Sequence, residues 1–168
     1  HDPEEALAMA DRLLIIKEGQ LEQIGPPQTC YLEPATPWVA GLLGAINRTT
    51  SVQDINNDRV YSVGPQIVQA LNPFPDVRFP VGQRVELRSR PEDIELYEQE
   101  PELHLTQRES AYRADSSFEG KYWRVTLCNE PDILYYALHE KYIEPGTQVW
   151  AVVTSDKLFV YPIADDQQ

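Results

Sequence analysis

One spacing recurs in this 168-residue chain and constrains its fold more than any other feature. In each of two copies, a glycine is followed at fixed distances by three apolar or aromatic residues. The copies lie 64 residues apart (146 − 82 = 64) and comprise Gly82, Val85, Ile94 and Tyr97, and then Gly146, Val149, Leu158 and Tyr161. Each copy predicts a turn, a strand, a short connection and a second strand. The chain therefore contains two half-repeats of one β unit.

Short strands are predicted over most of the chain beyond residue 47. Turn signals such as Asn56–Asp58 and Glu144–Gly146 separate segments in which apolar and polar residues alternate. The predicted strands are Arg59–Val63, Arg84–Ser89, Ile94–Tyr97, Tyr122–Cys128, Ile133–Leu138, Val149–Thr154 and Leu158–Tyr161. This spacing is typical of a small β barrel or sandwich.

The first 44 residues show a different pattern. Asp2 and Pro3 predict the start of a helix that runs to about Ala10. The run Leu13–Ile16 is apolar on both faces, like a strand buried inside a larger sheet, and it is expected to form a hairpin with Leu21–Ile24. Pro27 then starts a helix that ends before Pro34, and Thr36 caps another that ends before Gly44.

The N-terminal region resembles the H-loop and following segment of importer-type ABC ATPases. The resemblance rests on the first twelve residues, His1-Asp2-Pro3-Glu4-Glu5-Ala6-Leu7-Ala8-Met9-Ala10-Asp11-Arg12, and on Gly19, Ile24-Gly25, Tyr31, Pro34 and Trp38-Val39-Ala40. In that family the histidine of this motif contacts the ATP γ-phosphate and helps hold the attacking water. The resemblance implies that His1 is the switch histidine of a full-length protein. We expect the chain to begin inside a nucleotide-binding domain.

A second resemblance covers the β region. The segment Val85–Leu96, with Arg90-Pro91-Glu92 at its centre, resembles the V-x-x-x-x-RPE-x-I-x-L strand of the TOBE domain, and Leu43–Arg48 resembles the junction that leads into that domain. The implied fold is mainly β: an OB-like (TOBE) β-barrel module with two half-repeats, preceded by a short α/β remnant of the nucleotide-binding domain. The expected boundaries are 1–44 and 45–168.

Three ATPase motifs do not occur in the sequence. It contains no G-x-x-x-x-G-K-[ST] phosphate loop, no apolar strand ending in Asp-Glu and no Ser-Gly-Gly signature. Because the phosphate loop supplies the amides and lysine that hold the β- and γ-phosphates, we expect this chain alone not to hydrolyse ATP. ATP and Mg²⁺ are therefore expected as cofactors of the full-length parent only.

Charge and cysteine content exclude several classes of function. The formal net charge is −13, which disfavours binding to nucleic acid because that affinity comes mainly from Lys and Arg. Cys30 and Cys128 form no C-x-x-C pair, so neither a disulfide framework nor a zinc site is predicted, and no metal site is expected. No apolar run approaches the roughly 20 residues of a transmembrane helix.

The resemblance implies a regulatory and dimerisation region of an ABC importer subunit. The expected partners are a second copy of the subunit, with the tyrosines and Trp150 as anchors, and the membrane permease subunits, which would hold the protein at the cytoplasmic face of the membrane. The closing segment Asp156–Pro162 is most similar to the ferric-iron group, which makes ferric iron the first guess for the transported solute. Subunits for sulfate, polyamines and sugars have similar ends.

An alternative function for the β module is a sensor of small oxyanions such as molybdate or sulfate. Arg88 and Arg90 are the candidate anion-binding residues, since oxyanion sites often use arginine. A structural interpretation of the same residues is an ion pair between Arg90 and Glu92 or Asp93.

Overall fold

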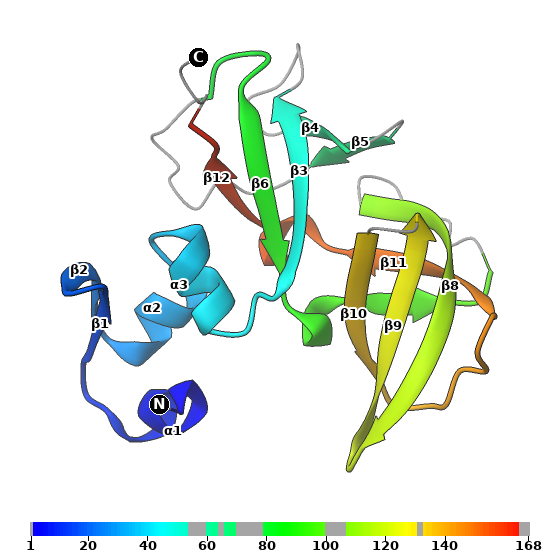
Figure 1. The fold of residues 1–168 in the computed structure, drawn as a ribbon, viewed down its shortest axis with the longest axis horizontal. Helices are drawn as coiled ribbons and strands as arrows, with labels where there is room; N and C mark the ends of the chain where they lie inside the picture. The colour runs from blue at the N-terminus through cyan, green and yellow to red at the C-terminus, as the bar shows by residue number, and fades with distance from the viewer. Residues whose placement is uncertain are drawn as a thin grey trace.

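The computed structural model describes residues 2–53, 60–63, 66–69, 79–99, 107–130 and 133–164. His1 and the predicted turn at Asn56–Asp58 lie outside the described residues. The described chain starts with α1, the β1–β2 hairpin, α2 and α3, and we call this part, residues 2–44, the helical segment. It continues into two five-stranded sheets, so the predicted mainly β fold is confirmed (Figure 1).

The helical segment follows the cap signals in the sequence. The helix α1 spans Pro3–Met9, and the Asp2 carboxylate accepts hydrogen bonds from the amides of Glu4 and Glu5. The strands β1 (Leu13–Lys17) and β2 (Gln20–Gly25) form an antiparallel hairpin, which is followed by α2 (Pro27–Leu32) and α3 (Pro37–Leu42). The Thr36 hydroxyl caps α3 by accepting from the Val39 amide at 3.2 Å.

The hairpin differs from the sequence prediction in one respect. Leu13 and Ile15 are buried against the helices, whereas Leu14 and Ile16 are 59% and 52% exposed. The expectation that both faces of β1 are buried is therefore wrong for this structure. The reason is that the sheet has two strands, so the helices cover one face and the opposite face stays open.

The two large sheets are antiparallel. One has the order β12-β6-β3-β4-β5 and the other β10-β9-β8-β11-β7. Their strands are β3 (Asn47–Gln53), β4 (Val60–Val63), β5 (Gln66–Gln69), β6 (Arg84–Ser89), β7 (Glu95–Tyr97), β8 (Gln107–Glu119), β9 (Tyr122–Glu130), β10 (Ile133–His139), β11 (Gln148–Val153) and β12 (Phe159–Pro162), with short 3₁₀ turns η1 (Pro91–Asp93) and η2 (Ser155–Lys157).

The two half-repeats exchange strands. The strand β6, the turn η1 and the strand β7 form one copy, and β11, η2 and β12 repeat this order 64 residues later. However, β6 pairs with β12, and β11 pairs with β7. Each half-repeat therefore completes the sheet of the other, which explains why both copies are needed for one module.

Three strands were not predicted from the sequence: β3, β5 and β8. The strand β8 is 13 residues long and pairs with both β9 and β11. It escapes prediction because its sequence, QRESAYRADSSFE, has few apolar residues. The other predicted strands agree with the structure to within one or two residues at each end.

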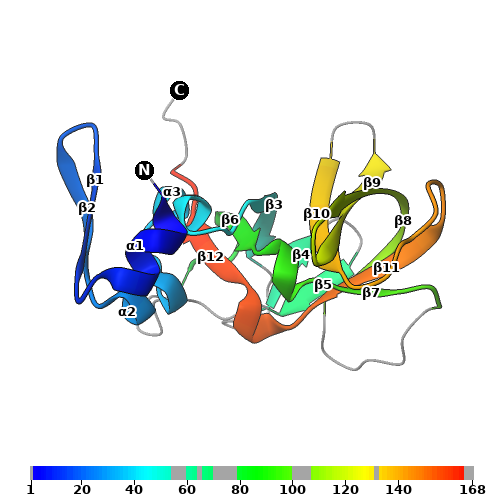
Figure 2. The ribbon, with the colours of Figure 1, turned by 90° about the horizontal axis from the view of Figure 1, so that it is seen from below.

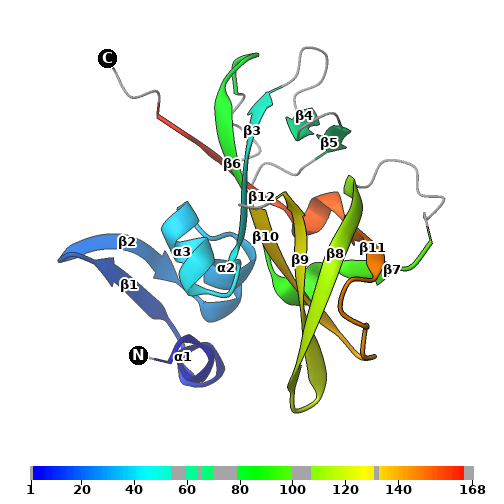
Figure 3. The same ribbon diagram turned by 45° about the vertical axis from the view of Figure 1, so that its right-hand side comes forward.

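The main core lies between the two large sheets. It contains both members of three equivalent pairs: Val85 and Val149, Leu87 and Ala151, and Ile94 and Leu158. Figure 2 shows the helical segment and the β8–β11 sheet at opposite ends of the molecule, with β12, β6 and β3 between them. In Figure 3 α2 and α3 again lie beside β6 and β12.

In the part of the chain that the structure describes, no helix combines the length and the apolar character that a membrane span requires.

Candidate functional site

The helical segment meets the sheets at one place, which we call the junction. It consists of the ends of α2 and α3, the residues Leu43–Ala45, and the strands β6 and β12. A small apolar cluster, formed by Ala40, Ala45, Phe159 and Tyr161, fills its centre. The junction therefore joins the two regions that the sequence assigns to different domains.

The end of α3 is shaped by a Schellman motif. The Gly44 amide donates to the Gly41 carbonyl at 3.2 Å, and the Ala45 amide donates to the Ala40 carbonyl at 2.8 Å. The Leu43 carbonyl lies at the cap position and is not part of this pair of bonds. It remains available to a donor from outside the helix.

Arg90 supplies that donor. Its Nε donates to the Leu43 carbonyl at 3.1 Å, and its Nη2 donates to the Tyr31 carbonyl in the last turn of α2 at 2.7 Å. The guanidinium carbon lies 3.6 Å from the centre of the Tyr31 ring and 4.9 Å from that of Phe159. Arg90 is only 3% exposed, so a buried cation serves the carboxyl ends of two helices.

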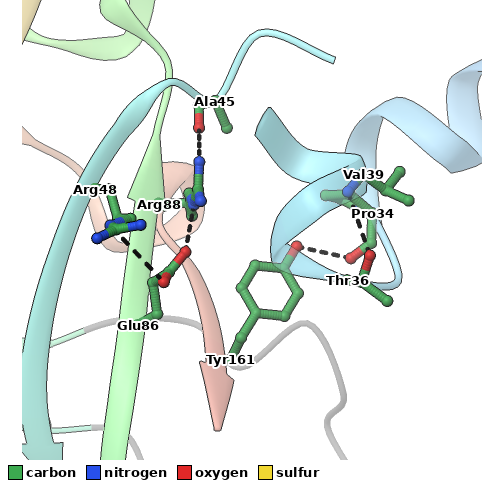
Figure 4. A network of polar contacts seen from close by, with 8 residues as sticks. All are labelled: Pro34, Thr36, Val39, Ala45, Arg48, Glu86, Arg88 and Tyr161. Carbon is green, nitrogen blue, oxygen red and sulfur yellow. Dashed lines mark hydrogen bonds and ion pairs between the residues drawn. The ribbon is translucent and has the colours of Figure 1, made fainter. Parts of the chain in front are cut away.

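Two further contacts fix the junction. The Tyr161 hydroxyl in β12 donates to the Pro34 carbonyl at 2.7 Å, as Figure 4 shows. Burial raises the pKa of the Tyr161 hydroxyl, which therefore stays protonated and acts as a donor. The Tyr31 hydroxyl also donates to a Glu92 carboxylate oxygen at 3.1 Å.

Arg88 lies in β6, two residues before Arg90, and has different partners. Its Nε donates to Glu86 at 2.6 Å, and its Nη1 donates to the Ala45 carbonyl at 3.3 Å (Figure 4). Arg48 is 3.9 Å from the second Glu86 oxygen and has a largely exposed side chain. A β-carbon added to Gly41 would lie 2.9 Å from Arg88 Nη1, so the glycine leaves room for the Arg88 guanidinium beside α3.

Asn47 links the two large sheets. Its backbone pairs with Ser89 in β6, while its side-chain amide donates to the Tyr136 carbonyl at 2.8 Å and accepts from the Tyr136 amide at 2.7 Å. The side chain thus bonds to the edge of β10 as a backbone peptide group would. Asn47 is 1% exposed, and these bonds satisfy its polar atoms in the interior.

A cavity of about 20 Å³ lies beside Asn47, between the sheets. Both members of the equivalent pairs Leu87 and Ala151, Ser89 and Val153, and Ile94 and Leu158 line it. This volume is enough for about one water molecule.

The relatives of the chain decide its family. No family model matches it. It is 39% identical over 122 residues to the spermidine/putrescine import ATP-binding protein PotA of Nitratidesulfovibrio vulgaris (strain Hildenborough), an alignment that covers 67% of this chain and 32% of the relative. It is 37% identical over 100 residues to PotA of Lawsonia intracellularis, with 58% and 26% covered. PotA of Salmonella typhi is 29% identical over 173 residues, an alignment that covers 94% of this chain and 45% of the relative.

The chain corresponds to the C-terminal part of importer-type ABC ATP-binding subunits. It spans between about a quarter and a half of the length of these curated relatives. The predicted membership of the ABC importer ATP-binding subunits is thereby confirmed. The guess of ferric iron is not supported, because the relatives are named for spermidine and putrescine.

The fold has a solved counterpart. The chain resembles the cytoplasmic molybdate-binding protein ModG, in a structure with molybdate bound, with a TM-score of 0.55, 12% identity, and coverage of 69% of this chain and 95% of that chain. At this identity the likeness concerns the fold alone, and it supports the predicted OB-like TOBE module with its two half-repeats.

Two of the three predicted site residues, Arg88 and Arg90, lie within the described part of the chain. His1 lies outside the described residues. Arg88 and Arg90 are both described, and their bonds go to Glu86 and to backbone carbonyls. Among the described residues Arg90 forms no ion pair with Glu92 or Asp93, and Asp93 instead lies 3.8 Å from Lys157. No group of three or more metal-binding side chains occurs in the residues described.

Sequence reasoning missed Asn47 and Tyr161 as contacts between regions. Asn47 belonged to a recognised junction motif, and Tyr161 to the repeat, but neither position indicated its partner. Their partners are 89 and 127 residues away in the chain, and local spacing carries no signal for such contacts.

Proposed function

We propose that this chain is the C-terminal regulatory region of the ATP-binding subunit of an ABC importer, with polyamines as the transported solutes. The subunit uses ATP and Mg²⁺, and His1 contacts the ATP γ-phosphate in the complete protein. Residues 1–44 belong to the nucleotide-binding domain and residues 45–168 form the TOBE module. The subunit works on the cytoplasmic face of the membrane through its permease partners.

The observation that carries this proposal is the open apolar face of the β1–β2 hairpin. Leu14, Ile16, Leu21 and Ile24 are each more than half exposed. A hollow of about 360 Å³, lined by α1, β1 and the end of α3, lies on the same segment. Contiguous exposed apolar residues of this kind mark a surface that packs against more protein. The PotA relatives are longer than this chain, which supports the proposal that the rest of an ATPase domain packs against this face.

Substitutions on this face test the proposal. In the complete gene product, Ile16→Asp is expected to abolish ATP hydrolysis, because it buries a carboxylate where the hairpin packs against the ATPase core. In this 168-residue chain the same substitution should leave the melting temperature nearly unchanged, because Ile16 is 52% exposed. Ile16→Val serves as the control in both proteins.

Transport supplies the second half of the test. Cells that lack the gene should lose uptake of labelled putrescine or spermidine, and the complete gene should restore it. Normal polyamine uptake in the deletion strain, or full ATPase activity of the Ile16→Asp protein, would contradict the proposed function.

A homodimer is part of the same proposal. Phe118, Trp123 and Tyr142 form an aromatic cluster at the β8–β9 end, with ring centroids 5.0 and 4.8 Å apart. Of the tyrosines predicted as anchors, Tyr142 is 51% exposed, whereas Tyr135 and Tyr161 are buried in the interior and cannot serve as anchors. Phe118 is 61% exposed, and exposed aromatic residues are common interface anchors. Sedimentation of the chain should show a dimer that Phe118→Ser weakens and that Leu42→Ser, at the opposite end of the molecule, does not.

The likeness to ModG favours one second candidate, an oxyanion sensor. Against it, the donors of Arg90 already bind carbonyl oxygens in a buried site. A sensor would be stabilised by about 2.7 kcal/mol at a ligand concentration 100 times the dissociation constant. We expect molybdate, sulfate and phosphate to give no selective rise in melting temperature, and a selective rise lost in Arg88→Ala or Arg90→Ala would favour the sensor.

A further inference from the structure

Arg90 occupies a position from which it contacts α2, the end of α3 and β12. It follows the end of β6, and Pro91 restricts its backbone to the extended region, where φ is −91° and ψ is 148°. The backbone therefore fixes the direction in which the side chain leaves the main chain. From there it reaches α2 through Tyr31, the end of α3 through Leu43, and β12 through Phe159.

The two helices depend on this residue for their charge balance. Helix carboxyl ends carry a partial negative charge and favour a cation nearby. Neither α2 nor α3, both fully described, has a basic residue in its last turn. Arg90 supplies one cation to both, and its planar guanidinium bonds to two carbonyls at once, which a lysine ammonium does less well.

The other hydrogen bonds across the junction each reach one helix or one connecting segment, and the bond from the Tyr31 hydroxyl of α2 to Glu92 is one of them. Tyr161 bonds to Pro34 in the loop after α2, and Arg88 bonds to Ala45 after α3. Within the part of the chain described, Arg90 is the side chain that bonds to both helix ends. The equivalent residue of the second half-repeat, Thr154, is exposed. Among the described residues, the connection to the helices is therefore made by the first half-repeat, after β6.

We propose that Arg90 is a positioning residue that couples movement of the helical segment to the two sheets. A shift of α2 and α3 would move the Arg90 side chain and, through it, β6 and β12. This inference rests on the proposed function, since it assigns to Arg90 the route by which the TOBE module and the ATPase domain influence each other during transport.

Two measurements on the complete gene product test this role. The first is hydrogen exchange of the Gly44 and Ala45 amides, which should become about tenfold faster in Arg90→Met as the end of α3 loosens. The second, with the permease in proteoliposomes, is the number of ATP molecules hydrolysed per putrescine taken up. We expect this ratio to rise about fivefold in Arg90→Met, with Arg90→Lys intermediate. A mere loss of folded protein would lower the rate of ATP hydrolysis and the rate of putrescine uptake together and leave their ratio unchanged.

Matched variants separate coupling from general damage. Arg84→Met, which replaces an exposed arginine at the start of β6, should change neither measurement. If Arg90→Met does not fold, Tyr31→Leu removes the stacked ring, and Tyr31→Phe keeps the ring while losing the bond to Glu92. We expect only the leucine variant to raise the exchange and the ratio.

The outcomes distinguish the two proposals. Equal exchange in Arg90→Met and Arg84→Met, or faster exchange with an unchanged ratio, overturns the coupling role of Arg90. If the wild-type protein drives no putrescine uptake, the proposed function fails, and the exchange measurement still decides whether Arg90 holds the junction.

Discussion

The two half-repeats have the same order of turn and strands but make different contacts with the rest of the molecule. Both begin at a turn glycine, continue through a strand whose inner residues are buried, and end in a strand that pairs with the other copy. Yet the residue that follows the first strand is the buried Arg90 in one copy and the exposed Thr154 in the other. The shared positions build the module, whereas the position that differs connects it to the helical segment.

The largest expected effect comes from the position at which the copies differ. Arg90→Ala should lower the free energy of unfolding by about 3 kcal/mol, because it leaves the carbonyls of Tyr31 and Leu43 without their donor in a buried site. Thr154→Ala should change it by less than about 0.5 kcal/mol, since exposed residues without specific contacts contribute little. Urea denaturation of both variants measures the difference. Equal losses would show that Arg90 has no special structural role.

The sequence predicts what is local in this comparison. The caps of α1 and α3, the β1–β2 hairpin and both half-repeats follow from residues that are near one another in the chain. The strands β3 and β8 were missed because their sequences are polar, and pairing with neighbouring strands stabilises them. Similarly, the sequence offered Glu92 and Asp93 as partners of Arg90, whereas its actual partners lie 47 and 59 residues away.

The second prediction tests whether the shared positions are equivalent. Val85 and Val149 are both fully buried in the main core. Each Val→Ala substitution removes two methyl groups and should cost about 2 kcal/mol, counting the transfer of the methyl groups and the cavity left behind. Thermal or urea unfolding should give values that agree within about 0.5 kcal/mol. A difference of more than about 1 kcal/mol would mean that the copies do not share one core.

The turn glycines give a smaller and equally symmetric effect. Gly82 and Gly146 have φ values of 83° and 87°, and a β-carbon at either position would meet no atom within 4 Å. A Gly→Ala substitution therefore adds only the strain of a left-handed backbone, about 1 kcal/mol in each copy. Melting curves of the two variants provide the measurement. A much larger loss at one turn would indicate a contact that the other lacks.

The smallest effect concerns Asp93 and Lys157, which are equivalent residues of the two copies and lie 3.8 Å apart. Burial raises the pKa of the Asp93 carboxyl above its ordinary value of 3.8, while Lys157 acts in the opposite direction and Glu92 adds to the rise. The folded protein therefore holds this proton more tightly than the unfolded chain does. It follows that the contribution of Asp93 to the free energy of unfolding grows as the pH falls through the raised pKa and becomes constant below 3.8. Asp93→Asn removes this dependence.

At neutral pH the Asp93→Asn substitution should change the free energy of unfolding by less than about 1 kcal/mol, because the loss of a partly exposed ion pair is offset by the loss of a buried charge. The difference in stability, wild type minus variant, should become more favourable to the wild type as the pH falls through the raised pKa of Asp93 toward its ordinary value of 3.8. Lys157→Met should extend this dependence to higher pH, since the carboxyl then loses the cation that lowers its pKa. Parallel pH profiles for the wild type and Asp93→Asn would instead mean that the Asp93 carboxyl titrates alike in the folded and unfolded chains, and that the two half-repeats meet here without any electrostatic effect on folding.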